Sequence, residues 1–341
     1  MIGRVATAVG AAVVSVVGVR AASRRVAGRL LEAPRVGPEE AALGPQLDAL
    51  GGEVVRFRSR DGLRLAGRWL PDEAGPPEAG SGEWTPDPHE AILLLHGYSG
   101  SIAPDLVEYA PFLRRTANVL GLDFRGHGDS DPGPSTFGML EVEDVAGALA
   151  WLGERGVHRV ALFGTSMGAM AAIAAVAILG DGSLAAADAE PDATRADIDP
   201  PRPRIVAVIA DSTAPEAETA VANRLPGPFR RFLAARAFDA ATRRLGADPR
   251  DTEPIRVIGL VEPVPLLLIH GEHDTTVPLD AARRLAEAAG PSAILWTVPG
   301  AEHSAGHAVA GQDYERIATD HLRMAIRAAR DHDLLDEKRD L

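Results

Sequence analysis

Residues Gly164-Thr165-Ser166-Met167-Gly168 lie between an apolar run, Val160 to Phe163, and a run of small and aliphatic residues, Ala169 to Leu179. The first run predicts a buried strand and the second a helix, so Ser166 is expected on a tight strand-to-helix turn. Glycines two positions before and after the serine let neighbouring backbone pass closely, because they carry no Cβ. This context is typical of a nucleophilic serine, and an ordinary Gly-Ser turn before a helix is the alternative.

The composition limits the classes of protein to which the chain can belong. Its 341 residues, 46% of them apolar, suffice for one large domain with a buried core. A net charge of −13 argues against nucleic acid as a partner, because phosphates would be repelled. The chain has no cysteine, which excludes disulfides, thiolate catalysis and cysteine-bound metals.

Apolar runs alternate with helical patterns along most of the chain. An antiparallel strand pair is expected over residues 54–70, around the turn signal Asp61-Gly62. Continuously apolar strands are buried on both faces, and their alternation with helices favours a parallel, doubly wound sheet. The predicted fold is therefore α/β, with a mostly parallel central sheet flanked by helices over residues 50–330. Strands are expected at 91–95, 119–122, 160–163, 205–210, 265–269 and 293–298, and helices at 105–115 and 141–152.

Three segments interrupt this pattern. Residues 71–89 and 180–203 are rich in proline, glycine and acidic residues, which predicts a long surface loop and a flexible insertion. Residues 214–259 follow a strand and combine helical patterns with arginine-rich, aromatic-bearing turns. We expect a small helical lid there, and a longer crossover connection is the alternative.

The N-terminal segment, residues 1–30, contains an uncharged apolar stretch from Val5 to Val19 with arginines on both sides. The stretch is shorter than the roughly 20 residues that cross a bilayer. Three interpretations stay open: a membrane anchor, a signal peptide cleaved near Ala21, and the start of a soluble helix. The arginine excess after the stretch favours an anchored protein with its catalytic domain on the cytoplasmic side, with secretion as the alternative.

A glycine-bearing turn, His96-Gly97-Tyr98, follows the strand at 91–95. Ligand sites of open α/β sheets collect at the carboxyl ends of such strands. The backbone N–H of Tyr98 is expected to join that of Met167 as an oxyanion hole. His96 is expected to order the loop instead of acting as a base.

The last two strands also end in polar turns. Asp274, after the strand at 265–269, is the expected carboxylate that orients a histidine, with Glu272 and Asp280 as alternatives. His303, after the strand at 293–298, is the expected general base, with His307 as the alternative. A metal site at His270, His273 and Asp274 is disfavoured, because no further histidine cluster supports it.

Taken together, these motifs resemble the α/β-hydrolase-fold serine hydrolases, specifically the bacterial esterase and lysophospholipase-like group. The order serine, aspartate, histidine at 166, 274 and 303 is the order of that family. The insertion at 180–203 and the apolar N-terminus depart from its pattern. The motifs that carry the resemblance, over about residues 54–325, are Arg56 to Gly62 with Gly67, His96 to Tyr98, Asp123 to Ser130, Gly164 to Gly168, Gly271 to Asp274 and Gly300 to His303.

The resemblance implies an acyl-enzyme on Ser166 that is hydrolysed by water activated by His303, without cofactor or metal. It also implies that Asp123 to Ser130 is structural. The expected substrate is a small-molecule carboxylic ester, with lipid or acyl compounds included. A serine oligopeptidase or aminopeptidase of the same fold, and a catalytically inactive membrane-anchored scaffold, are the alternatives.

Overall fold

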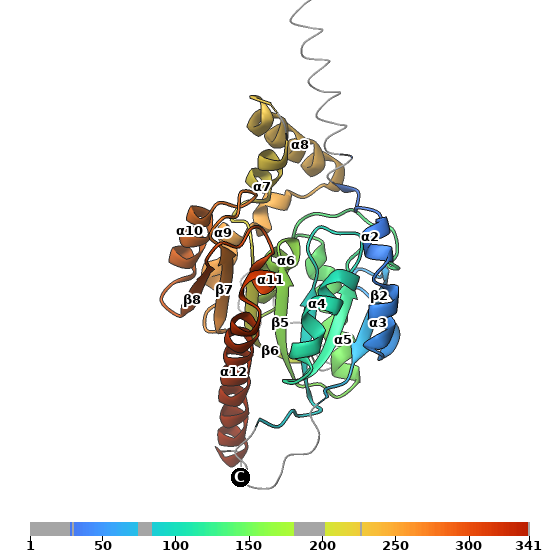
Figure 1. Cartoon of the computed structure of the whole chain (residues 1–341), viewed down its shortest axis with the longest axis vertical. Helices are drawn as coiled ribbons and strands as arrows, with labels where there is room; N and C mark the ends of the chain where they lie inside the picture. Colours follow the sequence, from blue (N-terminus) through green and yellow to red (C-terminus); the bar gives the residue numbers. More distant parts are fainter. Residues whose placement is uncertain (1–27, 29–30, 74–83, 181–201, 226, 340–341) are drawn as a thin grey trace, which may run out of the picture.

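The computed structural model describes residues 28, 31–73, 84–180, 202–225 and 227–339 (Figure 1). Within them, one eight-stranded sheet has the order β1-β2-β4-β3-β5-β6-β7-β8. The strands are β1 (Glu53–Arg58), β2 (Arg64–Leu70), β3 (Glu90–Leu95), β4 (Asn118–Asp123), β5 (Arg159–Thr165), β6 (Arg204–Asp211), β7 (Leu266–Gly271) and β8 (Ala293–Val298). The helices are α2 (Pro38–Ala41), α3 (Gly44–Ala49), α4 (Ala103–Leu113), α5 (Glu141–Glu154), α6 (Met167–Leu179), α7 (Ala217–Arg224), α8 (Arg230–Leu245), α9 (Pro254–Val257), α10 (Leu279–Ala289), α11 (Gly306–Ala310) and α12 (Gln312–Arg339).

The sheet is mostly parallel, which confirms the predicted α/β fold. Strands β4, β3, β5, β6, β7 and β8 run parallel to one another, whereas β2 is antiparallel to both β1 and β4. The predicted hairpin is present, with Arg58 of β1 opposite Arg64 of β2 across the Asp61-Gly62 turn. Because the parallel strands all point one way, the turns after β3, β5, β7 and β8 lie along one edge of the sheet.

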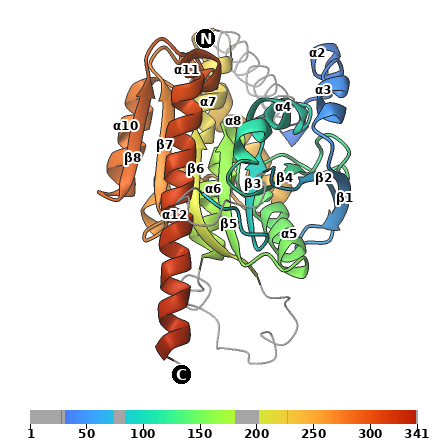
Figure 2. The ribbon, with the colours of Figure 1, turned by 60° about the horizontal axis from the view of Figure 1, so that its bottom comes forward.

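Two layers of helices cover the sheet, and successive residues of each central strand face opposite layers. Leu93 and Leu95 of β3 belong to the core that includes residues of α5 and α6, whereas Ile92 and Leu94 belong to the core that includes residues of α4 and α12. Figure 2 shows α4 and α12 crossing the same face of the sheet. Burial on both faces explains why β3 is apolar without interruption from Ala91 to Leu95.

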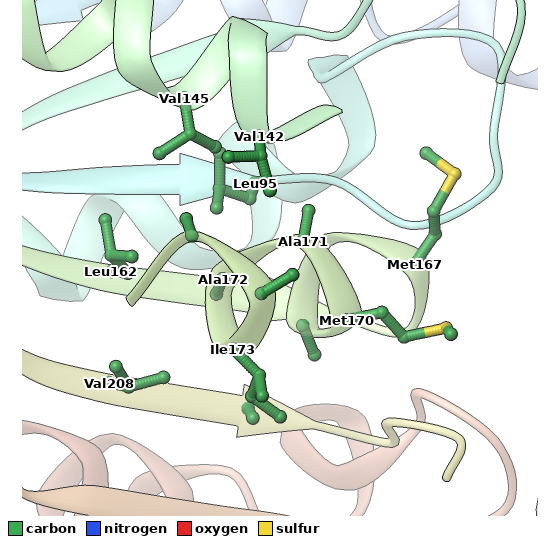
Figure 3. Close-up of a cluster of buried hydrophobic side chains, with 14 of the residues drawn as sticks. Leu95, Val142, Val145, Leu162, Met167, Met170, Ala171, Ala172, Ile173 and Val208 are labelled. Atoms are coloured by element: carbon green, nitrogen blue, oxygen red, sulfur yellow. The ribbon is translucent and has the colours of Figure 1, made fainter. Parts of the chain in front are cut away.

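Helix α6 is buried almost throughout, and alanine occupies many of its positions. Small side chains let the helix approach the strands closely, so Ala171, Ala172 and Ile173 pack between α5 and the sheet (Figure 3). Close packing of this kind leaves a helix little freedom to shift, because interiors are packed as densely as organic crystals. The residue that begins the helix is therefore held in place.

The region predicted as a lid, residues 214–259, forms α7, α8 and α9 with two short 3₁₀ turns. Figure 1 shows α7 and α8 projecting beyond the body of the molecule. Most of the predicted insertion, residues 181–201, and the apolar stretch Val5 to Val19 lie outside the described residues. Among the residues that are described, no helix is long and apolar enough to cross a membrane.

Candidate active site

Ser166 stands between the end of β5 and the start of α6, as the sequence predicts. Its backbone adopts φ 48° and ψ −106°, a conformation that residues other than glycine rarely take. A Cβ on Gly164 would overlap the backbone of Gly168, and a Cβ on Gly168 would overlap the carbonyl of Leu95. Both glycines are therefore required by close backbone contacts, and the sharp turn presents the hydroxyl of Ser166 at the edge of the sheet.

Ser166, His303 and Asp274 come together although they lie on three separate turns. The Oγ of Ser166 is 3.0 Å from Nε2 of His303, and Nδ1 of His303 is 2.7 Å from Oδ2 of Asp274. An imidazole between a hydroxyl and a carboxylate can accept the hydroxyl proton while the carboxylate stabilises the resulting positive charge. This arrangement can perform nucleophilic chemistry at Ser166.

The carboxylate of Asp274 is buried and held by the backbone of its own turn. Its Oδ1 accepts hydrogen bonds from the N–H groups of Thr276 and Val277, each at 2.8 Å. These two bonds leave Oδ2 directed at His303. The turn is also tied to the His303 loop, because the N–H of His273 donates to the carbonyl of Ala301 at 2.8 Å.

The turn after β3 lies beside Ser166. A Cβ on Gly97 would stand 3.5 Å from the Cβ of Ser166, which places the Gly97-Tyr98 backbone next to the nucleophile. The hydroxyl of Tyr98 donates to the carbonyl of Glu32 at 2.6 Å, and its ring stacks on Phe137. The side chain of Tyr98 is therefore held by contacts with Glu32 and Phe137. The oxyanion role of the Tyr98 and Met167 N–H groups stays a prediction.

His96 is fully buried and joins two loops. Its Nε2 accepts a hydrogen bond from the N–H of Phe124 at 3.1 Å, and its Nδ1 lies 2.6 Å from the carbonyl of Gly97. Burial, together with the neighbouring His127, lowers the pKa of His96 to about 3. His96 is therefore a neutral connector between the two loops, and its ring nitrogens contact Gly97 and Phe124.

The residues that were alternatives for the general base and for its orienting carboxylate have other partners. His307 lies between Glu108 and Glu315, at 3.3 and 3.4 Å, and these carboxylates raise its pKa. Glu272 accepts a hydrogen bond from Gly300, whereas Asp280 pairs with Arg283 at the surface. His270 contacts the carbonyl of Val277 at 2.7 Å and lies 3.5 Å from Oδ2 of Asp274. Within the described part of the chain, no group of three or more ligating side chains could hold a metal ion.

Several polar residues near Ser166, His303 and Asp274 were not predicted from the sequence. Asp211 ends β6 and Ser212 follows it, and Tyr314 reaches Asp211 from α12. Thr165, next to Ser166, donates to the buried carboxylate of Asp105 at 2.6 Å. One pair could have been found from the sequence. The polar residues Asp211 and Ser212 directly follow an apolar run, and Asp274 likewise stands a few residues after an apolar run.

The sequence and the fold resemble those of known proteins. The YfhR protein of Escherichia coli K12, which is uncharacterized, is 28% identical over 78% of this chain and 78% of its own length. The uncharacterized YqkD protein of Bacillus subtilis is 26% identical over 69% of this chain and 72% of its own length.

Among solved structures, the Pyrococcus furiosus esterase Pf2001 aligns with a TM-score of 0.60 and 21% identity, over 87% of this chain and 98% of its own. A membrane phospholipase A described as a bacterial virulence factor aligns with a TM-score of 0.53 and 16% identity, over 84% and 91%. At these identities the likeness concerns the fold. The family model described as the alpha/beta hydrolase family matches residues 92–319, and the chain therefore belongs to that family.

Proposed function

We propose that this protein hydrolyses carboxylic esters through an acyl-enzyme on Ser166. The observation that carries the proposal is the continuous relay from Ser166 Oγ through His303 to Asp274, with contacts of 3.0 and 2.7 Å. His303 takes the hydroxyl proton as Ser166 attacks the ester carbonyl, and it returns that proton to the departing alcohol. Water activated by His303 then releases the acid and restores Ser166.

The oxyanion formed in each step needs preorganised donors. We propose the backbone N–H groups of Met167 and Tyr98, one at the start of α6 and the other in the turn beside Ser166. Each such donor typically lowers the barrier by about 3 kcal/mol, because it faces charge that develops only in the transition state. Two of the structural neighbours are described as an esterase and a phospholipase, which supports an ester as the bond attacked.

The proposal is tested by covalent labelling followed by a substrate series. A fluorophosphonate probe should label the folded protein at Ser166, and the Ser166→Ala variant and heat-denatured protein should take up no label. The p-nitrophenyl esters of increasing acyl length, compared with p-nitroanilides of the same acyl groups, should show faster turnover of the esters. Absence of labelling in folded protein would contradict the hydrolase mechanism, and preference for the anilides would favour the peptidase alternative.

We also propose that the enzyme works at an anionic membrane surface, where lipid or acyl esters are available. Phe229 and Phe232 of the α8 region are 71% and 52% exposed, and the neighbouring Arg230 and Arg231 are exposed as well. Residues 217–245 contain six arginines and two acidic residues, whereas the whole chain carries a charge of −13. Exposed aromatic rings among cationic side chains favour binding to anionic lipid.

Vesicle sedimentation tests this second proposal. The full chain should sediment with vesicles that contain phosphatidylglycerol and less with purely phosphatidylcholine vesicles. The double variant Phe229→Ser and Phe232→Ser should reduce sedimentation severalfold, while Val54→Ser, which changes an apolar residue on β1 that is 59% exposed, should not. Equal sedimentation of the double variant and the parent would contradict a role for this surface.

A further inference from the structure

A second buried carboxylate, that of Asp211, lies next to the turn that presents Ser166. Asp211 is the last residue of β6, which neighbours β5 in the sheet, and only 1% of its surface is exposed. Its backbone carbonyl accepts a hydrogen bond from the N–H of Ser166 at 2.8 Å. Asp211 therefore contacts the same turn that presents Ser166.

Both carboxylate oxygens of Asp211 accept hydrogen bonds from hydroxyl groups. The hydroxyl of Tyr314, on α12, donates to Oδ2 at 2.6 Å, and the hydroxyl of Ser212 donates to Oδ1 at 2.8 Å. Helix α12 crosses β6, which brings the fully buried Tyr314 to this position (Figure 2). Burial raises the pKa of Asp211, and the two hydrogen bonds act against that shift.

Ser212 continues the chain of hydrogen bonds to the histidine loop. Its Oγ accepts a hydrogen bond at 2.9 Å from the N–H of Ser304, the residue that follows His303. Ser212 and Ser304 both adopt φ 54°, a backbone region that residues other than glycine rarely occupy. Such conformations persist only where the surrounding contacts hold them.

We propose that Tyr314, Asp211 and Ser212 form a positioning network that sets the orientation of His303 through the backbone of Ser304. The inference rests on the proposed ester hydrolysis. Asp274 fixes one edge of the imidazole ring, and the network fixes the main chain that carries the ring. All three act through His303 and are positioning residues, because His303 is the group that faces Ser166.

The network should affect the rate of the chemical step more than the binding of substrate. A general base works only within hydrogen-bond reach of the proton that it removes, and a displacement of about 1 Å can cost roughly a hundredfold in rate. Loosening of Ser304 would change the Ser166-His303 contact, because Ser304 follows His303 directly in the chain. The expected signature is a fall in kcat with little change in KM.

The chain offers a matched control next to Ser212. Thr213 is buried to a similar degree, and within the described structure its hydroxyl makes no hydrogen bond. The variant Thr213→Val removes a buried hydroxyl from the same turn without breaking a link to Ser304. A comparison of Ser212→Ala with Thr213→Val therefore separates the hydrogen bond from general disturbance of the turn.

The experiment measures kcat and KM for a p-nitrophenyl ester, with kcat expressed per active site titrated by the fluorophosphonate probe. Ser212→Ala should lower kcat by about ten- to a hundredfold with KM within about threefold of the parent. Tyr314→Phe, which keeps the ring and removes only the hydroxyl, should lower kcat by a smaller factor in the same direction. Thr213→Val should match the parent.

If Ser212→Ala does not fold, the proposal is tested with Tyr314→Phe, since this variant removes only the hydroxyl group from a packed ring. Parent-like kcat per titrated site in both variants, with lowered thermal stability alone, would overturn the network and show that these residues only stabilise the fold. A parent protein that neither takes up the probe nor cleaves esters would instead mean that the proposed function itself fails.

Discussion

Two clusters of buried polar side chains follow strands of the same sheet, and they use their charges differently. After β4, the guanidinium of Arg125 is 2% exposed and bonds to the carboxylates of Asp144 and Asp61. After β7 and β8, the carboxylate of Asp274 faces the imidazole of His303, which in turn faces Ser166.

The difference lies in what the partner of each carboxylate can do. Arginine stays protonated at any ordinary pH, so the Arg125 cluster neutralises charge and cannot transfer a proton. Imidazole exchanges a proton near neutral pH, so the second cluster can move charge during a reaction. We therefore expect substitutions in the first cluster to act on stability and substitutions in the second to act on rate.

The largest effect is expected for Ser166→Ala. Loss of the nucleophile should lower kcat/KM for a p-nitrophenyl ester by roughly 10⁴- to 10⁶-fold, because the acyl-enzyme cannot form. The melting temperature should change little, since alanine meets the same backbone constraint at φ 48°. Ser292→Ala, a serine exposed in the turn before β8, is the control, and activity of Ser166→Ala equal to this control would exclude Ser166 as the nucleophile.

Asp274→Asn should follow, with a loss of roughly 10²- to 10⁴-fold in kcat. The amide keeps the shape of the carboxylate but cannot stabilise a positive charge on His303. Asp280→Asn, at an exposed aspartate paired with Arg283, should leave kcat unchanged. Steady-state kinetics on both variants check the prediction, and an equal effect of the two would contradict the assignment.

Arg125→Met should destabilise the protein and spare its chemistry. It leaves the fully buried Asp144 without its cation, which typically costs about 3–5 kcal/mol of unfolding free energy. Denaturant unfolding should show this loss, whereas kcat per titrated active site should stay within twofold of the parent. Arg283→Met, at an exposed pair, should cost less than about 1 kcal/mol. An unchanged unfolding free energy in Arg125→Met would show that the Arg125 cluster does not stabilise the fold.

The smallest effect is expected at His307, where neighbouring carboxylates raise the pKa of the imidazole. A raised pKa means that the folded protein holds this proton more tightly than the unfolded chain does. The stabilisation is complete below the unfolded pKa of about 6.5 and is lost as pH rises through the folded value. The difference in unfolding free energy between parent and His307→Gln should be larger at pH 6 than at pH 9, by under about 1 kcal/mol. A difference that grows with pH would contradict this.

Much of the fold could be predicted from local patterns. The strands at 91–95 and 293–298 lie at or within one residue of the expected bounds, because apolar residues buried on both faces leave an unbroken signal. Helix α5 begins at Glu141 as expected, whereas α4 begins at Ala103 instead of Asp105, since helix ends depend on capping and on tertiary contacts.

The contacts among site residues could be predicted only in part. The glycine spacing around Ser166 marks the turn in the sequence itself, because the constraint is local. The sequence did not reveal that Tyr314 reaches Asp211, because the two residues are 103 positions apart and meet only when α12 packs on the sheet.

The sequence by itself determined which segments become strands, where the turn at Ser166 falls, and which few polar residues stand at strand ends. The sequence favoured His303 over His307 as the base, but only the tertiary structure shows which groups each of the two rings contacts. Both lie just beyond the same strand, but one ring faces Ser166 and the other faces Glu108 and Glu315. The physical reason is that periodicity and glycine placement act within a few residues, whereas the direction of a side chain depends on every element packed around it.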